Sequence, residues 1–186
     1  MTTLSIYDEN AESIGSALTD AEAITRVLDE SGIQFERWAA DRPVAADASP
    51  EDVLHAYREP IGVLKNRYRF ASVDVVALRP DHPQKDEFRS KFLSEHTHAD
   101  YEIRFFVDGA GLFYLHIGQQ VLLLLCEKGD LISVPANTPH WFDMGKYPDF
   151  KCIRFFTTEN GWEASFTDSG IDRKFPDMDA YVSSLA

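Results

Sequence analysis

The sequence predicts one mainly β domain of the α+β class, an antiparallel barrel or sandwich preceded by helices. From residue 102 onward, short apolar or alternating runs are separated by glycine, proline and aspartate turns, which is typical of that architecture. The earlier part carries two helix-start signals. The 186 residues, 44% of them hydrophobic, are enough for one globular domain with a real core. We expect the barrel core at about 71–168, a strand and helix portion at about 1–70, and a loosely held polar tail at about 169–186.

The first elements are a short strand and a helix. Residues 4–7 are a strand candidate. Thr19 and Glu22 have the spacing of a capping box, which predicts a helix over 21–30 that Gly32 terminates.

A second strand and helix follow. Residues 35–38 alternate as a strand, and Ser49 followed by Pro50 is a strong helix start, because a capping hydroxyl precedes proline at the first helical position. The helix should continue to about residue 65. Pro60 lies inside this pattern and should kink or divide the helix.

The barrel strands come next. Residues 71–78 are expected as a strand and 83–92 as a short helix. The remaining strands are expected at 102–107, 112–117, 121–126, 131–134, 141–142, 151–157 and 163–166.

Composition excludes several classes of function. A net charge of −13 without a stripe of Lys and Arg argues against nucleic-acid binding, which requires clustered cations. We find no leader sequence and no run of eighteen apolar residues, so we expect no membrane association. Cys126 and Cys152 have no metal-type spacing and are expected to be buried thiols in a reducing cytosol. A cytoplasmic location is therefore expected. We also expect a monomer.

A group of three histidines and one glutamate carries the strongest functional signal. In a strand, side chains two apart share a face, so His96 and His98 project together. Four residues of unbroken strand would carry Glu102 roughly 13 Å beyond His98, so residues 99–101 must contain a bend. With the later His140, these side chains form the ligand set of a divalent transition metal.

Two motifs contain these residues. The pattern His-x-His-x3-Glu-x6-Gly ends at Gly109, and the second pattern runs Gly129-x5-Pro135-x4-His140. Both resemble the signature motifs of the cupin superfamily, which implies a jelly-roll antiparallel β barrel around a metal, with helices packed outside. Three positions differ from the motifs without removing a ligand: Ser90, Asn137 and Met144.

A narrower resemblance covers about residues 4–168. Residues 91–98, 102–111 and 135–145, with Phe35-Glu36-Arg37-Trp38 and Gly161-Trp162, look like acireductone dioxygenase. The resemblance implies cleavage of acireductone, 1,2-dihydroxy-5-(methylsulfanyl)pent-1-en-3-one, with O2 in methionine salvage. It implies 4-methylsulfanyl-2-oxobutanoate and formate with Fe(II), or 3-methylsulfanylpropanoate, formate and carbon monoxide with Ni(II), with one ion per monomer.

The ligand set itself favours a catalytic ion. Four protein ligands leave two positions of a six-coordinate metal open for water or substrate. Structural zinc sites normally close with four ligands, commonly thiolates, and no cysteine belongs to this group. Fe(II) or Ni(II) is favoured, while catalytic Zn(II) and Mn(II) remain open.

Three neighbours of the ligands are candidates for further roles. Arg104 shares the face of Glu102, so it could be a catalytic cation that stabilises an anionic substrate; the alternative is a structural ion pair. Glu95 has the opposite parity and should face away from the metal. The resemblance suggests that it acts in metal incorporation, and the alternative is a solvated glutamate. The resemblance also implies conformational coupling at Tyr101, where relatives commonly have an acidic residue.

Aromatic side chains could form an apolar pocket for a thioether tail. By parity, Phe106 and Phe142 are the first choices, and Arg154 could also point inward. The candidate substrate-binding residues are Phe92, Phe105, Phe106, Phe142, Arg154 and Trp162. The remaining histidines are interpreted as structural: His55, His82 and His116.

Two other classes of function fit the same four ligands. A different mononuclear cupin enzyme would keep the ligands and need a different surrounding shell. A non-catalytic cupin that binds a small ligand would hold metal and consume no oxygen. The absence of an added DNA-binding domain disfavours a regulator.

Overall fold

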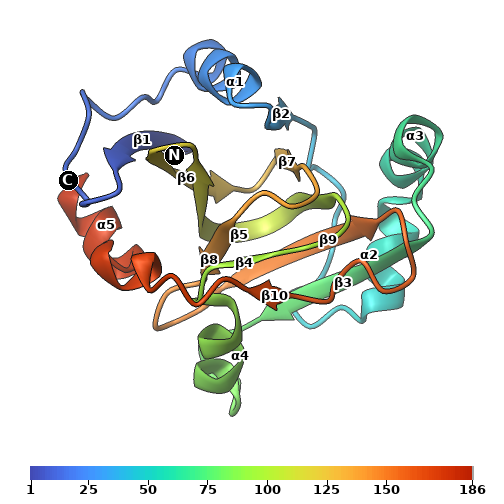
Figure 1. Cartoon of the computed structure of the whole chain (residues 1–186). Coiled ribbons are helices and arrows are strands. Elements are labelled where there is room, and N and C mark those ends of the chain that lie inside the picture. Colours follow the sequence, from blue (N-terminus) through green and yellow to red (C-terminus); the bar gives the residue numbers. More distant parts are fainter. Residues whose placement is uncertain (186) are drawn as a thin grey trace.

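The barrel is organised around strand β5 (Glu102–Ile117), which pairs with four other strands (Figure 1). The computed structural model describes residues 1–185. The first half of β5 pairs with β7 (Asp130–Val134) and β9 (Phe150–Phe156). Its second half pairs with β6 (Gln120–Glu127) and β8 (His140–Asp143). One strand therefore belongs to both facing sheets.

The expectation of two separate strands at 102–107 and 112–117 was wrong. A bulge between Phe106 and Asp108 shifts the register, and Gly109 follows with a φ of +67°. A Cβ at Gly109 would overlap with the backbone carbonyl of Asp149. Glycine therefore allows the chain to bend from one sheet into the other without losing its pairing.

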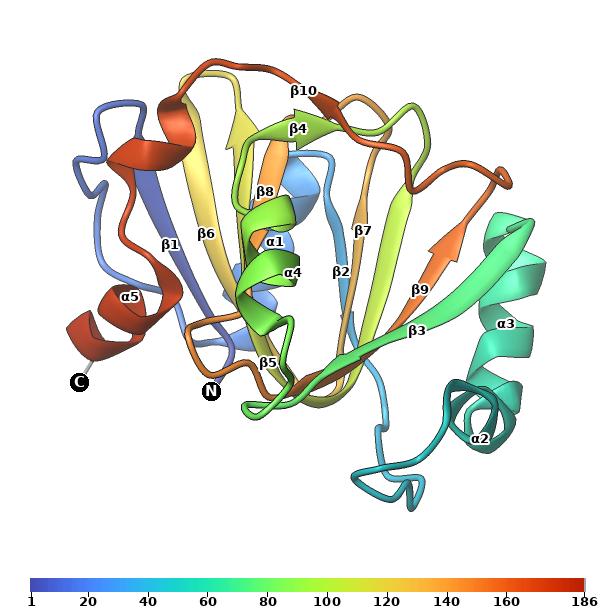
Figure 2. The same cartoon turned by 90° about the horizontal axis from the view of Figure 1, so that it is seen from below.

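The outer strands complete an antiparallel fold, as expected (Figure 2). Strand β1 (Thr3–Asp8) pairs with β6, and β2 (Gln34–Arg37) pairs with β7. Strand β3 (Ser72–Leu78) pairs with β9. In the same sheet as β1 and β6, β8 pairs with β4 (His96–Thr97), which pairs with β10 (Ser165–Phe166). The last strand is shorter than the expected 163–166.

Three helices lie in the N-terminal portion. Helix α1 (Ala21–Glu30) has the expected bounds, but the predicted capping box was wrong, because Asp20 is the residue adjacent to the first turn and accepts the N–H of Ala23. Ser49 caps α2 (Pro50–Ala56) as expected. The helical segment is interrupted at Tyr57, and α3 (Arg58–Tyr68) follows.

Pro60 explains this division. Its nitrogen cannot donate to the carbonyl of Ala56, four residues earlier, and Ala56 is the last residue of α2. Pro60 instead lies in the first turn of α3, where a missing N–H costs little. The predicted kink or division is thus confirmed.

Helix α4 (Lys85–Phe92) lies beside β8 and is tied to it by an ion pair between the partly buried Arg89 and the buried Asp143. The Arg89 guanidinium donates from Nε to Asp143 Oδ1 at 2.6 Å and from Nη2 to Asp143 Oδ2 at 2.8 Å. Asp143 also accepts the backbone N–H groups of Gly145 and Met178. One carboxylate therefore joins α4, β8 and the C-terminal segment.

The expectation of a loosely held tail was wrong for the described residues 169–185. This segment forms the 3-10 helix η1 (Ile171–Lys174) and helix α5 (Met178–Ser184). Three of its apolar side chains pack into a buried cluster with Trp141 on the outer face of the barrel: Ile171, Phe175 and Tyr181. These three residues are widely spaced among polar ones, so the average polarity of the segment gives no sign that they are buried.

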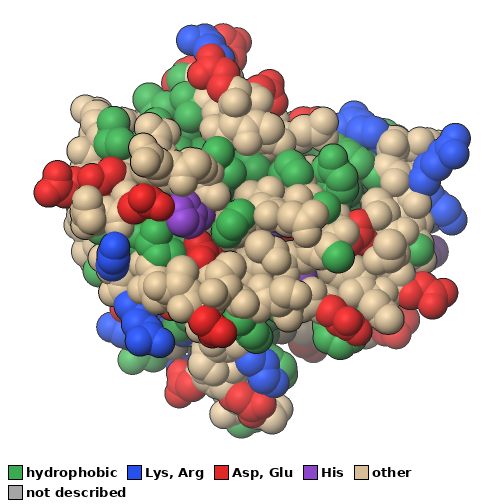
Figure 3. Space-filling view, in the orientation of Figure 1, with side chains coloured by type: hydrophobic (Ala, Val, Ile, Leu, Met, Phe, Trp, Pro, Cys, Tyr) green, Lys and Arg blue, Asp and Glu red, His purple; other side chains and the backbone are tan. Residues whose placement is uncertain are grey.

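The apolar core has an inner and an outer part. Inside the barrel lie both cysteines, which are free and buried as expected. A second cluster lies between the sheet and α2 and α3. Acidic and basic side chains are interspersed on the face drawn in Figure 3. Among residues 1–185, no helix is long and apolar enough to span a membrane.

Candidate metal centre

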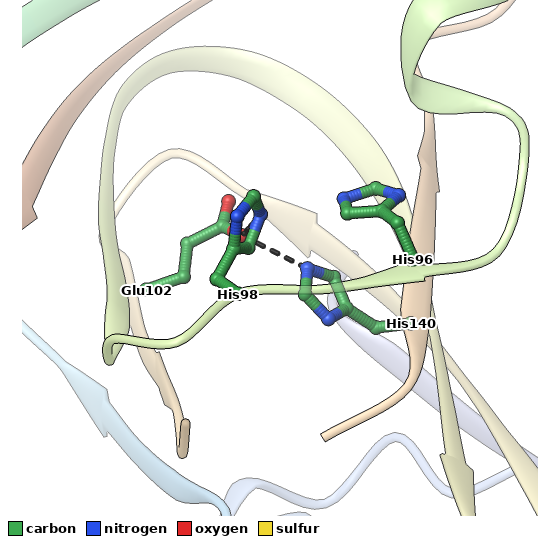
Figure 4. A group of neighbouring side chains, drawn as sticks. All are labelled: His96, His98, Glu102 and His140. Atoms are coloured by element: carbon green, nitrogen blue, oxygen red, sulfur yellow. Dashed lines mark hydrogen bonds and ion pairs between the residues drawn. The ribbon is translucent and has the colours of Figure 1, made fainter. Parts of the chain in front are cut away.

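The four predicted ligands converge at one end of the barrel (Figure 4). His96 lies in β4 and His98 just after it, while Glu102 and His140 open β5 and β8. One ligand atom from each lies within 4.8 Å of the others, and all four side chains are buried. The chain bends at residues 99–100, which confirms the predicted turn that returns Glu102 to the group.

Backbone carbonyls orient all three imidazoles. The Nδ1 atom of His96 bonds to the carbonyl of Ser94 at 2.7 Å, and that of His140 to the carbonyl of Thr138 at 2.8 Å. His98 Nδ1 bonds to the Glu163 carbonyl at 2.8 Å. A carbonyl only accepts, so each Nδ1 carries the proton and each neutral ring keeps its Nε2 lone pair for a metal.

The Glu102 carboxylate supplies the anionic ligand. Its Oε2 lies 2.9 Å from His140 Nε2 and 3.2 Å from His98 Nε2. Its Oε1 forms an ion pair with Arg104 Nε, but the two atoms lack hydrogen-bond geometry and both are buried. A buried carboxylate whose Oε2 lies among imidazoles with converging Nε2 atoms fits a divalent cation.

The pKa values of the ligands follow from burial and proximity. Burial, with His140 beside it, lowers the pKa of His96 to about 4, so this ring is neutral at neutral pH. Burial alone would raise the pKa of Glu102, but the Arg104 guanidinium and the neighbouring rings of His140 and His98 hold it well below its usual range. Burial alone would lower the pKa of His98, but the Glu102 carboxylate beside it leaves it raised.

Arg104 lies against the metal ligands, as parity predicts. Its side chain is 4% exposed, and its guanidinium carbon stands 4.7 Å from the ring centre of Phe142 and 5.6 Å from that of Phe92. The carboxylate that it pairs with is the ligand Glu102 itself. A structural ion pair and a catalytic cation would therefore both place the Arg104 guanidinium in the same position, beside the metal centre.

A cavity of about 420 Å³ is lined by three of the four ligands, His96, His98 and Glu102. Of the predicted pocket residues, Phe92, Arg154 and Trp162 line it, together with Arg104. Arg154 donates from Nε and Nη2 to the two carboxylate oxygens of Asp74, at 2.9 and 2.7 Å. The pocket thus contains two arginines, each paired with a carboxylate.

Three predicted pocket residues are not part of this wall. Phe105 packs on the far side of the sheet, against Trp38 and Tyr57. Phe106 and Phe142 point into the barrel, as parity predicts, but both are fully covered in the core below the cavity. The alternation of side chains along a strand shows which face each one is on. It does not show whether a side chain reaches the cavity surface or lies in the core below it.

The sequence interpretation also missed part of the wall. The further lining residues are Phe88, Lys91, Phe156, Ala164 and Phe166. Phe156 shares the strand face of Arg154, a parity signal that could have found it. Phe166 pairs with His96 across β10 and β4, a non-local contact with no local signal.

Glu95 faces away from the metal, as predicted, but it is not a solvated glutamate. It is buried and bonded to His116 Nδ1 at 2.6 Å, Ser169 Oγ at 2.6 Å and Thr167 Oγ1. Tyr101 is 43% exposed. Neither arrangement tests the roles that the resemblance implies for these residues.

The three histidines interpreted as structural lie outside the ligand group. His116 bridges Glu95 and Glu9, and His82 packs edge-on against Phe88. His55 is exposed on α2. The centre therefore uses only the histidines that the two motifs contain.

Comparison with known proteins decides the family. The sequence model described as the ARD/ARD' family matches residues 3–164. The chain belongs to the ARD/ARD' family. Family members similar to it include acireductone dioxygenase of Methylococcus capsulatus, 50% identical over 186 residues and 100% of both chains. That of Aquifex aeolicus is 51% identical over 183 residues, covering 98% of this chain and 100% of the relative.

A solved structure of the ARD/ARD' type agrees with the fold. Acireductone dioxygenase from Bacillus anthracis, with a cadmium ion in its active centre, superposes with a TM-score of 0.80 at 26% identity. The match covers 89% of this chain and 98% of that one. This ARD/ARD' family member is therefore an oxidoreductase of the dioxygenase class with a site for one divalent metal, as predicted.

Proposed function

We propose that this ARD/ARD' family member cleaves acireductone with O2, using one Fe(II) or Ni(II) held by His96, His98, Glu102 and His140. The observation that carries the proposal is the convergence of the four ligand atoms, within 4.8 Å of one another, beside an aromatic cavity that His96, His98 and Glu102 line. The relatives named above, which match nearly the whole chain, support acireductone as the substrate.

The ligand shell suits an anionic, chelating substrate. When bound, the metal ion supplies a Lewis acid that lowers the pKa of hydroxyl groups that coordinate it. We assign Arg104 to stabilise the resulting enediolate, because a buried guanidinium beside the ligands is a fixed positive charge in a region with little water. Arg154 lies on the wall of the same cavity and adds a second cation.

The rest of the cavity suits a thioether. Its apolar wall consists mainly of aromatic rings, including Phe92, Phe156 and Trp162. Sulfur makes favourable contacts with aromatic rings at about 5 Å. We therefore assign these rings to the methylsulfanyl tail, with the reacting enediol at the metal end and the tail toward the opening.

The metal sets the expected products. We propose 4-methylsulfanyl-2-oxobutanoate and formate with Fe(II), and 3-methylsulfanylpropanoate, formate and carbon monoxide with Ni(II). Both ions accept three imidazoles and a carboxylate, so availability decides the loading.

We place the reaction in methionine salvage and in the cytoplasm, where free buried thiols such as Cys126 and Cys152 persist. A monomer, metal incorporation through Glu95 and coupling through Tyr101 stay predictions.

Product analysis tests this proposal. Metal-free protein is loaded anaerobically with Fe(II) or Ni(II), given acireductone and O2, and the acids and carbon monoxide are quantified. We expect the two product sets above, and no enzymatic product from metal-free protein. A different cupin enzyme would leave acireductone intact and act on another diketone or a thiol. A binding protein would hold the metal and form no product.

A further inference from the structure

The loop between β9 and β10, residues 157–164, forms one side of the cavity opening. It carries Trp162 and Ala164 into the cavity wall. Trp162 is nevertheless 57% exposed, so burial alone does little to hold its ring. Polar contacts must therefore fix this loop relative to the metal centre.

Asp100 provides those contacts at the start of the loop. This carboxylate is 5% exposed and lies in the turn between His98 and Glu102. Its Oδ2 accepts the backbone N–H of Thr158 at 2.8 Å and the Thr158 hydroxyl at 3.1 Å. Its Oδ1 accepts the hydroxyl of Thr157 and the backbone N–H of Tyr101 at 2.7 Å. Both oxygens are therefore fully used as acceptors.

Gly161 shows how closely the loop approaches this carboxylate. A Cβ at position 161 would overlap with Asp100 Oδ2 and press on the side chain of Phe156. The residue before Trp162 must therefore be glycine for the loop to close over Asp100.

The far end of the loop is tied to the metal centre itself. His98 Nδ1 donates to the carbonyl of Glu163, the residue after Trp162. Trp162 thus lies between two attachments, Asp100 and His98, which both belong to the ligand turn. Loss of the first attachment would leave the second in place.

We propose that Asp100 is a positioning residue that holds Trp162 over the opening of the metal cavity and thereby sets the affinity for substrate. The part that concerns substrate rests on the proposed function. Asp100 does not reach the metal or the substrate, and it acts only through the loop.

Replacing Asp100 by asparagine should break these hydrogen bonds while keeping the size and shape of the side chain nearly the same. Each oxygen of Asp100 accepts one backbone N–H, so either orientation of an amide places its NH2 group against a backbone N–H. Gly161→Ala disturbs the same contact from the other side. Matched controls are Asp20→Asn, which alters a helix cap distant from the cavity, and Gly62→Ala, where a Cβ meets nothing within 4 Å.

The experiment combines a measurement without substrate and one with it. Acrylamide quenching of Trp162 is obtained by subtracting the fluorescence of each protein's Trp162→Phe counterpart. We expect Asp100→Asn and Gly161→Ala to increase this quenching, to raise KM for acireductone about tenfold and to keep kcat within about twofold. Iron content should stay at that of the wild type, and both controls should behave like the wild type.

Two results would overturn the proposal. One is Trp162 quenching that is unchanged in both variants. The other is loss of bound iron in Asp100→Asn, which would make Asp100 a part of the metal centre's own scaffold. If the wild type does not turn over acireductone, the proposed function fails, and the quenching measurement still decides whether Asp100 positions the loop.

Discussion

Each ligand imidazole donates its Nδ1–H to a backbone carbonyl, so the main chain sets the orientation of all three rings. The Nε2 lone pairs then converge because β4, the ligand turn and β8 are adjacent. Arg104 completes the centre with a buried cation that rests on the ring of Phe142. At the residue scale, the centre is thus preorganised by backbone and packing.

Arg104 offers the sharpest test at this scale. In Arg104→Ala we expect turnover to fall by about 10²-fold, because a fixed cation beside the substrate is lost. Metal content should remain at the wild-type level, since the three imidazoles keep their backbone contacts. Steady-state kinetics and metal analysis on the same samples check both points. Arg26→Ala, on the exposed face of α1, is the control. Loss of metal from Arg104→Ala would show that its role is structural.

The sequence predicts the ligands well and the pocket wall poorly, for a physical reason. The spacing of His96 and His98 defines one strand face, and the required bend brings Glu102 back to it. Parity cannot separate a residue at the cavity surface from one below it, so Phe106 and Phe142 were placed on the wall although they lie in the core. Phe166 depends on the pairing of β10 with β4, which no local pattern encodes.

At the scale of elements, the ion pair between Arg89 and Asp143 fixes α4, whose Phe88 and Phe92 line the cavity. Asp143 is fully buried and also holds the C-terminal segment through the N–H of Met178. Burial alone would raise the pKa of Asp143, but the hydrogen bonds from Arg89 and from two backbone amides leave it lowered. The ionised form is therefore the one that stabilises the fold.

Asp143→Asn should show this through its pH dependence. A carboxyl whose folded pKa is lowered contributes stability above its unfolded pKa of about 3.9, and the contribution disappears as pH falls through the folded value. We expect Asp143→Asn to be less stable than the wild type by about 3 kcal/mol at pH 7, with the difference shrinking below about pH 4. Urea denaturation across this range measures it, with the exposed Asp81→Asn as control. A difference that is constant with pH would contradict this assignment.

Where a local signal is strong, the start of an element was predicted to the residue, as in α2, which begins at Pro50 after the cap Ser49. The prediction of two separate strands in place of β5 failed for a physical reason. Gly109 and Gly111 look like a turn in the sequence, yet partner strands on both sides keep the backbone paired through a bulge. Tertiary pairing decides whether a glycine ends a strand or bends it.

At the scale of the whole molecule, the C-terminal segment closes one outer face of the barrel. The ring of Phe175 packs at 6.0 Å from that of Tyr7 and 5.6 Å from that of Trp141. This segment therefore connects the first strand to β8, which carries His140.

Phe175→Ala tests whether this packing is part of the folded domain. We expect a loss of about 3 kcal/mol in the free energy of unfolding, as for other buried phenylalanines. Chemical denaturation measures it. Val182→Ala, at an exposed position of the same segment, should change stability by less than about 0.5 kcal/mol. Equal effects in both variants would mean that the segment does not pack as described.

On the proposed function, the four-ligand centre carries out an oxygen-dependent cleavage of acireductone. The most direct test is oxygen uptake by Fe(II)-loaded protein given fresh acireductone, compared with His96→Ala and with His55→Ala, which alters an exposed histidine outside the centre. We predict rapid uptake by the wild type and His55→Ala, and only background uptake by His96→Ala. Uptake by the iron-loaded wild type that does not exceed that of His96→Ala would contradict the proposed cleavage of acireductone.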